Sequence, residues 1–158
     1  MSEWLQVGTA IPTFCLPDAD GRLLQSSQWS GAPLVIYFYP RDDTPGCTRE
    51  ACAFRDAASE LRQLGASVVG ISADSPISHA KFRDKYGLNF ALLSDVDHAV
   101  SQSFGAYREK NLYGKKSMGI QRSTFLVASN GTIAKLWKRV QVDGHHDQVI
   151  QALKVLPT

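Results

Sequence analysis

The sequence predicts an α/β fold with a mixed central sheet and helices on both faces. Two continuous apolar runs of strand length, residues 34–39 and 67–72, have the composition of strands buried on both faces. A helical pattern follows each run, and a hairpin signal lies near the carboxyl end. This order implies parallel strands joined by helical crossovers, with antiparallel strands beside them.

The amino-terminal part predicts a hairpin and then the first buried strand. Within Phe14–Leu24, two apolar segments flank an Asp-Gly turn signal, which indicates a hairpin extension in front of the main sheet. Residues 34–39 then read Leu-Val-Ile-Tyr-Phe-Tyr, and Pro40 ends this strand.

The middle of the chain predicts two strand–helix units. From Pro45 to about Leu64, apolar residues recur at three- and four-residue steps, so we expect one helix that Gly65 closes. After the strand at 67–72, residues 76–86 have a helical pattern that ends at Gly87.

The remaining elements complete a thioredoxin-like order in a single domain that spans residues 1–158. The strongest hairpin signal is Asn130-Gly131, which lies between two β-branched and aromatic runs. The expected elements are a strand at 90–93, a helix at 96–104, strands at 123–128 and 132–137, and a helix from about 146 to 156.

Composition excludes several classes of function. The chain has 158 residues, 44% hydrophobic and 20% charged, and its net charge of +2 is too mild to favour nucleic-acid binding. No apolar run approaches the ~20 residues of a membrane span, and the polar start with Glu3 does not resemble a secretory signal. Three cysteines are too few, and odd in number, for a secreted disulfide scaffold, so we expect a reducing, cytoplasmic location.

The segment between the first strand and the first helix carries the chemistry. Thr44 suits the N-cap and Pro45 the first helical position, which places Cys47 third in the helix. Free amide N–H groups and the helix dipole favour a thiolate there, and Arg41 and Arg49 could add positive potential. Cys47 is therefore the candidate nucleophile, and the alternative is a small buried hydrophobe.

The other two cysteines differ in their placement. Cys52 lies five residues after Cys47 on the same helix, so their Cα atoms stand roughly 8.6 Å apart, beyond the ~7 Å that a disulfide tolerates. Pairing would require the first turns to unwind, and the alternative is that Cys52 is an inert core cysteine. Cys15, in the predicted hairpin, is expected to be a packed strand cysteine.

The spacing Pro-x-x-x-Thr-x-x-Cys, formed by Pro40, Thr44 and Cys47, resembles the signature of peroxiredoxins. The longer string Tyr-Phe-Tyr-Pro-Arg-Asp-Asp-Thr-Pro-Gly-Cys-Thr-Arg-Glu-Ala-Cys-Ala-Phe-Arg-Asp is similar to the peroxiredoxin Q group, also called bacterioferritin comigratory protein. The likeness covers nearly the whole chain, including residues 70–75, 93–95 and 122–125.

This resemblance implies a role for each matching residue. Cys47 would attack the terminal peroxide oxygen, and Thr44 would hydrogen-bond the thiolate and the peroxide. Arg122 would hold the thiolate and stabilise charge as the O–O bond breaks, which is what a fixed cation does best in a dry pocket. Pro40 would shield the sulfur from solvent, and Glu50 would orient an arginine.

The resemblance also implies the reaction cycle. Cys52 matches the resolving cysteine of those group members that carry one on the same helix, so the disulfide would form within one chain. The enzyme would reduce hydrogen peroxide and organic hydroperoxides, with thioredoxin as the usual reductant and a monomer as the expected state. No metal or organic cofactor is implied, because the chemistry resides in thiols.

Three other functions compete with this interpretation. A thioredoxin-like disulfide reductase would need Cys-x-x-Cys, whereas the spacing here is Cys-x-x-x-x-Cys. A zinc site could use Cys47 and Cys52, but His145 and His146 are expected to be solvated turn residues. A redox sensor would use the same reactive thiol without turnover.

Two groups of residues outside the motif have plain interpretations. Aromatic residues near the motif could line a peroxide pocket, but core packing is the expected role of Trp29, Tyr37, Tyr39 and Phe54. Arg108, Lys110, Lys115 and Lys116 are expected to form a solvated basic loop.

Overall fold

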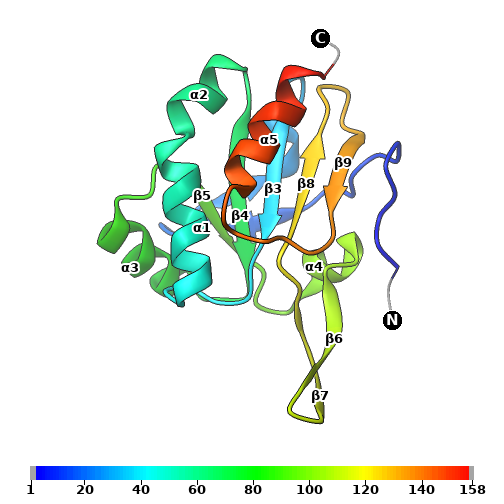
Figure 1. Cartoon of the computed structure of the whole chain (residues 1–158). Coiled ribbons are helices and arrows are strands. Elements are labelled where there is room, and N and C mark those ends of the chain that lie inside the picture. The colour runs from blue at the N-terminus through cyan, green and yellow to red at the C-terminus, as the bar shows by residue number, and fades with distance from the viewer. Residues whose placement is uncertain (1–2, 157–158) are drawn as a thin grey trace.

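The structure, a computed structural model, describes residues 3–156 (Figure 1). Its elements are β1 (Cys15–Pro17), β2 (Leu23–Gln25), the 3-10 helix η1 (Ser26–Trp29), β3 (Leu34–Phe38), α1 (Pro45–Asp56), α2 (Ala58–Gln63), β4 (Ser67–Ser72), α3 (Pro76–Tyr86), β5 (Ala91–Ser94), α4 (Ala99–Phe104), β6 (Tyr107–Leu112), β7 (Lys115–Ile120), β8 (Ser123–Val127), β9 (Ile133–Trp137) and α5 (His145–Lys154). No helix among these described residues has the length and apolar character needed to cross a membrane.

The central sheet is mixed, as the sequence predicts. Its strand order is β5-β4-β3-β8-β9; β3, β4 and β5 run parallel, while β8 is antiparallel to β3 and to β9. Every residue of β3 is buried, because both faces of the sheet are covered. The predicted amino-terminal hairpin also forms, as β1 paired with β2.

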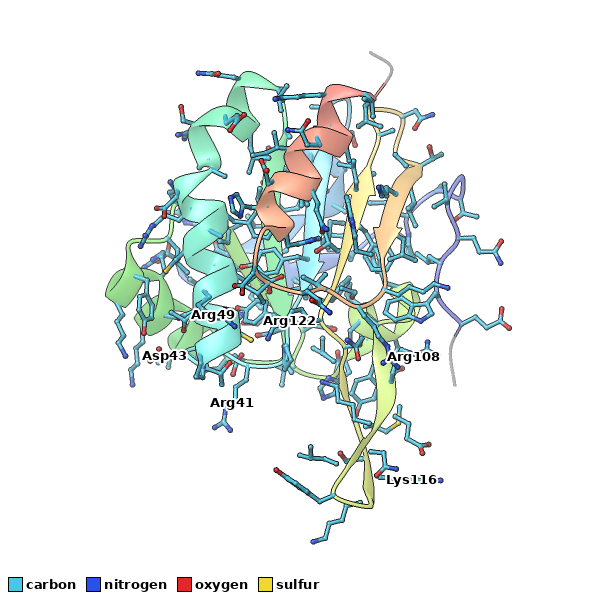
Figure 2. The ribbon with its side chains drawn as sticks, viewed as in Figure 1. Arg41, Asp43, Arg49, Arg108, Lys116 and Arg122 are labelled. Atoms are coloured by element: carbon cyan, nitrogen blue, oxygen red, sulfur yellow. The ribbon has the colours of Figure 1, made fainter. Side chains whose placement is uncertain are left out.

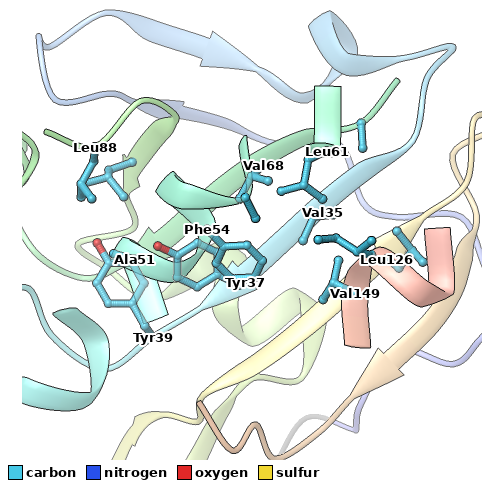
Figure 3. Close-up of a cluster of buried hydrophobic side chains, with 14 of the residues drawn as sticks. Val35, Tyr37, Tyr39, Ala51, Phe54, Leu61, Val68, Leu88, Leu126 and Val149 are labelled. Carbon is cyan, nitrogen blue, oxygen red and sulfur yellow. The ribbon is translucent and has the colours of Figure 1, made fainter. Parts of the chain in front are cut away.

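Side chains on β3 alternate between two hydrophobic clusters, one on each face. Tyr37 and Tyr39 belong to a cluster that includes Phe54 of α1 and Val149 of α5 (Figure 3). Phe82 of α3 belongs to the same cluster. The opposite face packs against α4 and the amino-terminal segment. Helices therefore cover both faces, as predicted, and the core role expected for Tyr37, Tyr39 and Phe54 is confirmed.

Two helices differ from their expected bounds. The helix expected from 45 to 64 is divided at Ala57, whose N–H is shared between the carbonyls of Ala53 and Arg55. No glycine or proline stands at this break, and the apolar side chains keep their three- and four-residue spacing across it. The sequence therefore predicted one helix and not two. α4 begins later than expected, because the Asp95 carboxylate accepts the N–H groups of Val100 and Ser101 and so fixes where the helix starts.

The basic loop predicted around residues 108–116 is wrong, since these residues form the β6–β7 hairpin that projects from the body of the domain (Figure 1). Its two-residue turn has positive φ at both Tyr113 (53°) and Gly114 (78°), the pattern of a type I′ turn. Tyrosine is an unusual first residue for such a turn, and the charged strands on either side lack an apolar pattern. For these two reasons the sequence did not indicate a hairpin here.

The expectation of a packed Cys15 is also wrong, because its thiol is exposed. Its neighbours Phe14 and Leu16 are buried, and successive side chains in a strand point to opposite faces. Cys15 therefore faces outward.

Candidate active site

The start of α1 presents Cys47 as the sequence predicts. Thr44 is the N-cap with extended backbone, Pro45 follows it, and Cys47 is the third residue of the helix, with only 1% of its surface exposed. The Thr44 hydroxyl does not cap the helix; it donates instead to the carbonyl of Arg41 at 2.9 Å. The N–H groups in the first turn of α1, where Cys47 lies, therefore receive no hydrogen-bond acceptor from the Thr44 side chain.

A buried polar network fixes the loop that leads into α1. The Asp42 carboxylate accepts from the Tyr39 hydroxyl at 2.6 Å and the Ser78 hydroxyl at 2.8 Å, and lies 2.7 Å from His79 Nδ1. The Asp42 backbone N–H donates to Asp74 at 2.8 Å. The loop before α1 is thus tied to Tyr39 at the end of β3, to the segment after β4 and to α3.

Arg122, just before β8, joins Cys47 to Glu50. Its Nη2 donates to Cys47 Sγ at 3.3 Å, and its Nη1 donates to Glu50 Oε1 at 2.8 Å. The carboxylate side chain is 1% exposed and the arginine side chain 17%. Glu50 thus holds the guanidinium that contacts the sulfur, and the structure brings together three of the residues singled out from the sequence.

The ion pair has unequal partners. Burial raises the pKa of Glu50 to about 7, against the opposing charge and hydrogen bond of Arg122. Burial also lowers the pKa of Arg122, but the charges of Glu50 and Cys47 outweigh it and leave that pKa above its usual range. Only the carboxyl is fully enclosed, so desolvation exceeds the attraction for Glu50 alone. Its second oxygen, Oε2, has no hydrogen-bond partner among the described residues.

Gly46 permits the approach of Arg122, a role that sequence reasoning missed. A Cβ at this position would lie 3.0 Å from Arg122 Nη2, closer than a neighbouring side chain normally comes. The only signal in the sequence is a glycine inside the first turn, where no positive φ requires it.

The other predicted site residues occupy different surroundings. Pro40 is exposed at the end of β3, and its shielding of the sulfur stays a prediction. Cys52 is partly buried on the same unbroken helix as Cys47, and both thiols are free. Arg41 is exposed, and Arg49 forms an exposed ion pair with Asp143, so their positive charge lies around the helix start and not on the sulfur (Figure 2).

Comparison with known proteins decides the family. Residues 7–136 match the AhpC/TSA family. The chain is 46% identical over 149 residues to a putative peroxiredoxin bcp of Coxiella burnetii, covering 94% of this chain and 99% of that one. It is 40% identical over 150 residues to peroxiredoxin Bcp of Bacillus subtilis, covering 95% and 96%. This chain belongs to the AhpC/TSA family and is a peroxiredoxin.

Solved structures agree with this assignment. The bacterioferritin comigratory protein of Xanthomonas campestris, studied for its alkyl peroxide reduction activity, matches this peroxiredoxin with a TM-score of 0.88 and 40% identity over 94% of this chain and 98% of that one. A Cys-to-Ser mutant of peroxiredoxin Q from Xylella fastidiosa matches with a TM-score of 0.91 and 33% identity over 97% and 98%. The thioredoxin-like peroxiredoxin fold and the resemblance to the Q group are thereby confirmed.

The peroxiredoxin departs from expectation at His145, which is buried and not solvated. Its Nε2 lies 2.8 Å from the Thr124 hydroxyl and its Nδ1 lies 3.0 Å from Gln148, while its ring packs edge-on against Phe54 and Trp137. Burial lowers the pKa of His145. This histidine attaches the start of α5 to the sheet, a contact between distant segments that no local pattern indicates.

The zinc alternative finds no support in the described part of the peroxiredoxin. Within residues 3–156, the one group of three potential metal ligands is Asp42, Asp74 and His79, and it includes no cysteine. All three already belong to the network that anchors the loop before α1.

Proposed function

We propose that this peroxiredoxin reduces hydrogen peroxide and organic hydroperoxides through Cys47, and that Cys52 resolves the oxidised cysteine within the same chain. The observation that carries the proposal is the Arg122 guanidinium, which contacts both Cys47 Sγ and the buried carboxyl of Glu50. A fixed cation beside the sulfur favours the thiolate and any negative charge that develops next to it.

In the first step the Cys47 thiolate attacks the terminal oxygen of the hydroperoxide. An S–O bond forms as the O–O bond breaks, so the sulfur becomes a sulfenic acid and the other oxygen leaves as an alkoxide or hydroxide that takes a proton from water. Arg122 and the first-turn N–H groups of α1 face this charge. The Thr44 hydroxyl, now turned toward Arg41, would rotate to contact the peroxide.

In the second step the Cys52 thiol attacks the Cys47 sulfenic acid, which forms a disulfide and releases water. Both cysteines lie on one continuous helix, so α1 must open for the sulfurs to meet. Pro45 and Gly46 occupy its first turn, and glycine is a poor helix former, which lowers the free energy needed to open that end.

A dithiol then reduces the Cys47–Cys52 disulfide and is itself oxidised. We propose thioredoxin as this reductant, and a cytoplasmic monomer as the working form, because both reacting thiols belong to one chain and the cycle requires a reducing compartment. Sedimentation of the reduced protein at micromolar concentration tests the monomer.

The activity test couples peroxide consumption to NADPH oxidation through thioredoxin and its reductase. Cys47→Ser should abolish turnover. Cys52→Ser should form the Cys47 sulfenic acid but sustain no NADPH oxidation, because no disulfide forms for thioredoxin to reduce and further peroxide oxidises the sulfenic acid to sulfinic acid. Cys15→Ser is the matched control, since this exposed thiol lies on β1 and its loss should leave turnover unchanged. Turnover by Cys52→Ser at the wild-type rate would refute the resolving role, and a wild type without turnover would favour a redox sensor.

A conformational test follows the helix. One equivalent of peroxide should reduce the far-UV helical signal of the wild type, because α1 must unwind to form the disulfide. Cys52→Ser should keep its helical signal under the same treatment. Full helicity in the disulfide form would contradict the proposed opening of α1.

A further inference from the structure

The tip of the β6–β7 hairpin, residues 111–118, carries a cluster of exposed apolar side chains. Leu112 is 65% exposed, Tyr113 in the turn 97% and Met118 46%. These are three of the eight large exposed hydrophobic residues in the described part of the chain. Every residue of the tip is exposed, because the hairpin projects away from the body of the domain (Figure 1). Single exposed apolar residues are normal on a protein surface, whereas a cluster of them marks a binding surface.

The same hairpin concentrates positive charge. Residues 107–120 contain four basic side chains and one acidic side chain, a net charge of +3; the whole chain has +2, so the rest of it carries −1. The acidic residue, Glu109, pairs with Lys116 on one face of the ladder at 3.7 Å. The opposite face carries Arg108, Lys110 and Lys115, and the strand register places no acidic residue there. This face therefore attracts an anionic surface.

The tip places apolar and basic groups in the order that suits a lipid surface. Tyr113 lies in the turn, and tyrosine favours the headgroup level of a bilayer because its ring is apolar and its hydroxyl polar. Lys115 and Lys116 follow at once, with apolar stems and ammonium groups that can reach phosphates. Arg41 projects from the same end of the molecule as Lys116 (Figure 2). A headgroup layer deforms around such a convex tip, whereas a protein partner would have to supply a matching pocket.

We propose that the β6–β7 hairpin docks this peroxiredoxin on the surface of an anionic phospholipid bilayer. Leu112 and Tyr113 enter the headgroup region, and Lys115 and Lys116 lie against the lipid phosphates. The attachment is peripheral, since no helix among residues 3–156 is long and apolar enough to cross the bilayer. It uses neither Cys47 nor peroxide, so it goes beyond the proposed peroxidase function and is tested without it.

Co-sedimentation with lipid vesicles tests the proposal. At low ionic strength the wild type should sediment with vesicles that contain phosphatidylglycerol, much less with vesicles of pure phosphatidylcholine, and high salt should release it. Lys115→Gln should weaken binding about fivefold, the contribution of one basic residue near an anionic surface. Tyr113→Asn should weaken it about 3- to 10-fold, because the apolar ring is lost. This variant creates Asn-Gly, the pair that a type I′ turn favours, so the hairpin is kept.

Two variants far from the tip control this experiment. Lys81→Gln removes the same charge from an exposed position on α3. Val155→Ser removes an exposed apolar side chain just after α5, at the end of the molecule opposite the hairpin (Figure 1). Both should bind as the wild type does, and unchanged thermal unfolding shows that each variant is folded.

Three results would overturn the proposal. The first is a wild type that does not sediment with phosphatidylglycerol vesicles at low ionic strength. The second is equal binding by the wild type, Tyr113→Asn and Lys115→Gln, which would place the lipid contact elsewhere. The third is a wild type that self-associates without vesicles while Tyr113→Asn does not, since the tip would then be a contact between copies of this chain.

Discussion

Glu50→Gln should change how the stability of the protein depends on pH. The folded protein raises the pKa of Glu50 from 4.5 to about 7, mainly through burial. A group whose pKa is higher in the folded state stabilises the fold fully below its unfolded pKa and loses that contribution as pH rises through its folded pKa. The window for Glu50 therefore runs from about pH 4.5 to about pH 7.

The size of the effect follows from the same two values. A rise from 4.5 to about 7 corresponds to about 3 kcal/mol of unfolding free energy. Glutamine has the shape of the protonated acid and does not titrate. The unfolding free energy of wild type minus that of Glu50→Gln should thus fall by about 3 kcal/mol between pH 4 and pH 8.

Urea unfolding at a series of pH values measures this difference. The wild-type curve alone is not sufficient, because the lowered pKa of His145 acts in the opposite direction. Glu60→Gln, on the exposed part of α2, is the matched control and should keep the pH dependence of the wild type. A difference between wild type and Glu50→Gln that stays constant from pH 4 to pH 8 would refute the reasoning.

Three other predictions concern the surroundings of the site. Gly46→Ala should stabilise α1 but lower kcat/KM for hydrogen peroxide about tenfold. The reason is that a Cβ 3.0 Å from Arg122 Nη2 displaces the guanidinium from the sulfur. An unchanged kcat/KM in a stopped-flow assay would argue against this. Asp42→Asn should lower the unfolding free energy by about 2–4 kcal/mol, since Tyr39, Ser78 and His79 lose a buried charged acceptor, whereas Asp43→Asn, at an exposed pair with Lys85, should lose less in the same urea titration. His145→Gln should reduce the loss of stability on acidification. The folded protein lowers the pKa of His145 from 6.5, so the contribution of this histidine to the unfolding free energy is present above about pH 6.5 and is lost as pH falls through the folded pKa. Equal losses of stability in wild type and variant between pH 7.5 and pH 5 would contradict this prediction.

Local patterns in the sequence were sufficient for the elements that carry Cys47. The buried strand before it, the N-cap at Thr44 and the proline after it are all signals within a few residues, and the structure has them at the expected positions. The contacts of Arg122 with Cys47 and Glu50 span 75 and 72 residues. No periodicity encodes such a contact, and only the family resemblance pointed to that arginine.

The misses have the same physical origin. His145 and Asp42 are polar residues whose burial depends on partners from distant elements, so composition alone made His145 appear solvated and gave Asp42 no role. Gly46 matters through the space that it leaves for the side chain of Arg122, from the segment just before β8. In each case the sequence gives the residue type, but the fold supplies the neighbour that determines its role.

Glu50 lies between Cys47 and Cys52 on α1, so its surroundings would change when the helix opens to form the disulfide. Unwinding that brings the two sulfurs together would carry Glu50 out of its enclosure and release Arg122 from its anchor. The oxidised chain would then no longer hold the arrangement that reacts with peroxide. Near neutral pH the freed carboxylate would regain its hydration. This gain would offset the free-energy cost of unwinding the helix by about 3 kcal/mol. Below about pH 4.5 the exposed carboxyl is also protonated, so this stabilising contribution is lost and the free energy needed to form the disulfide rises.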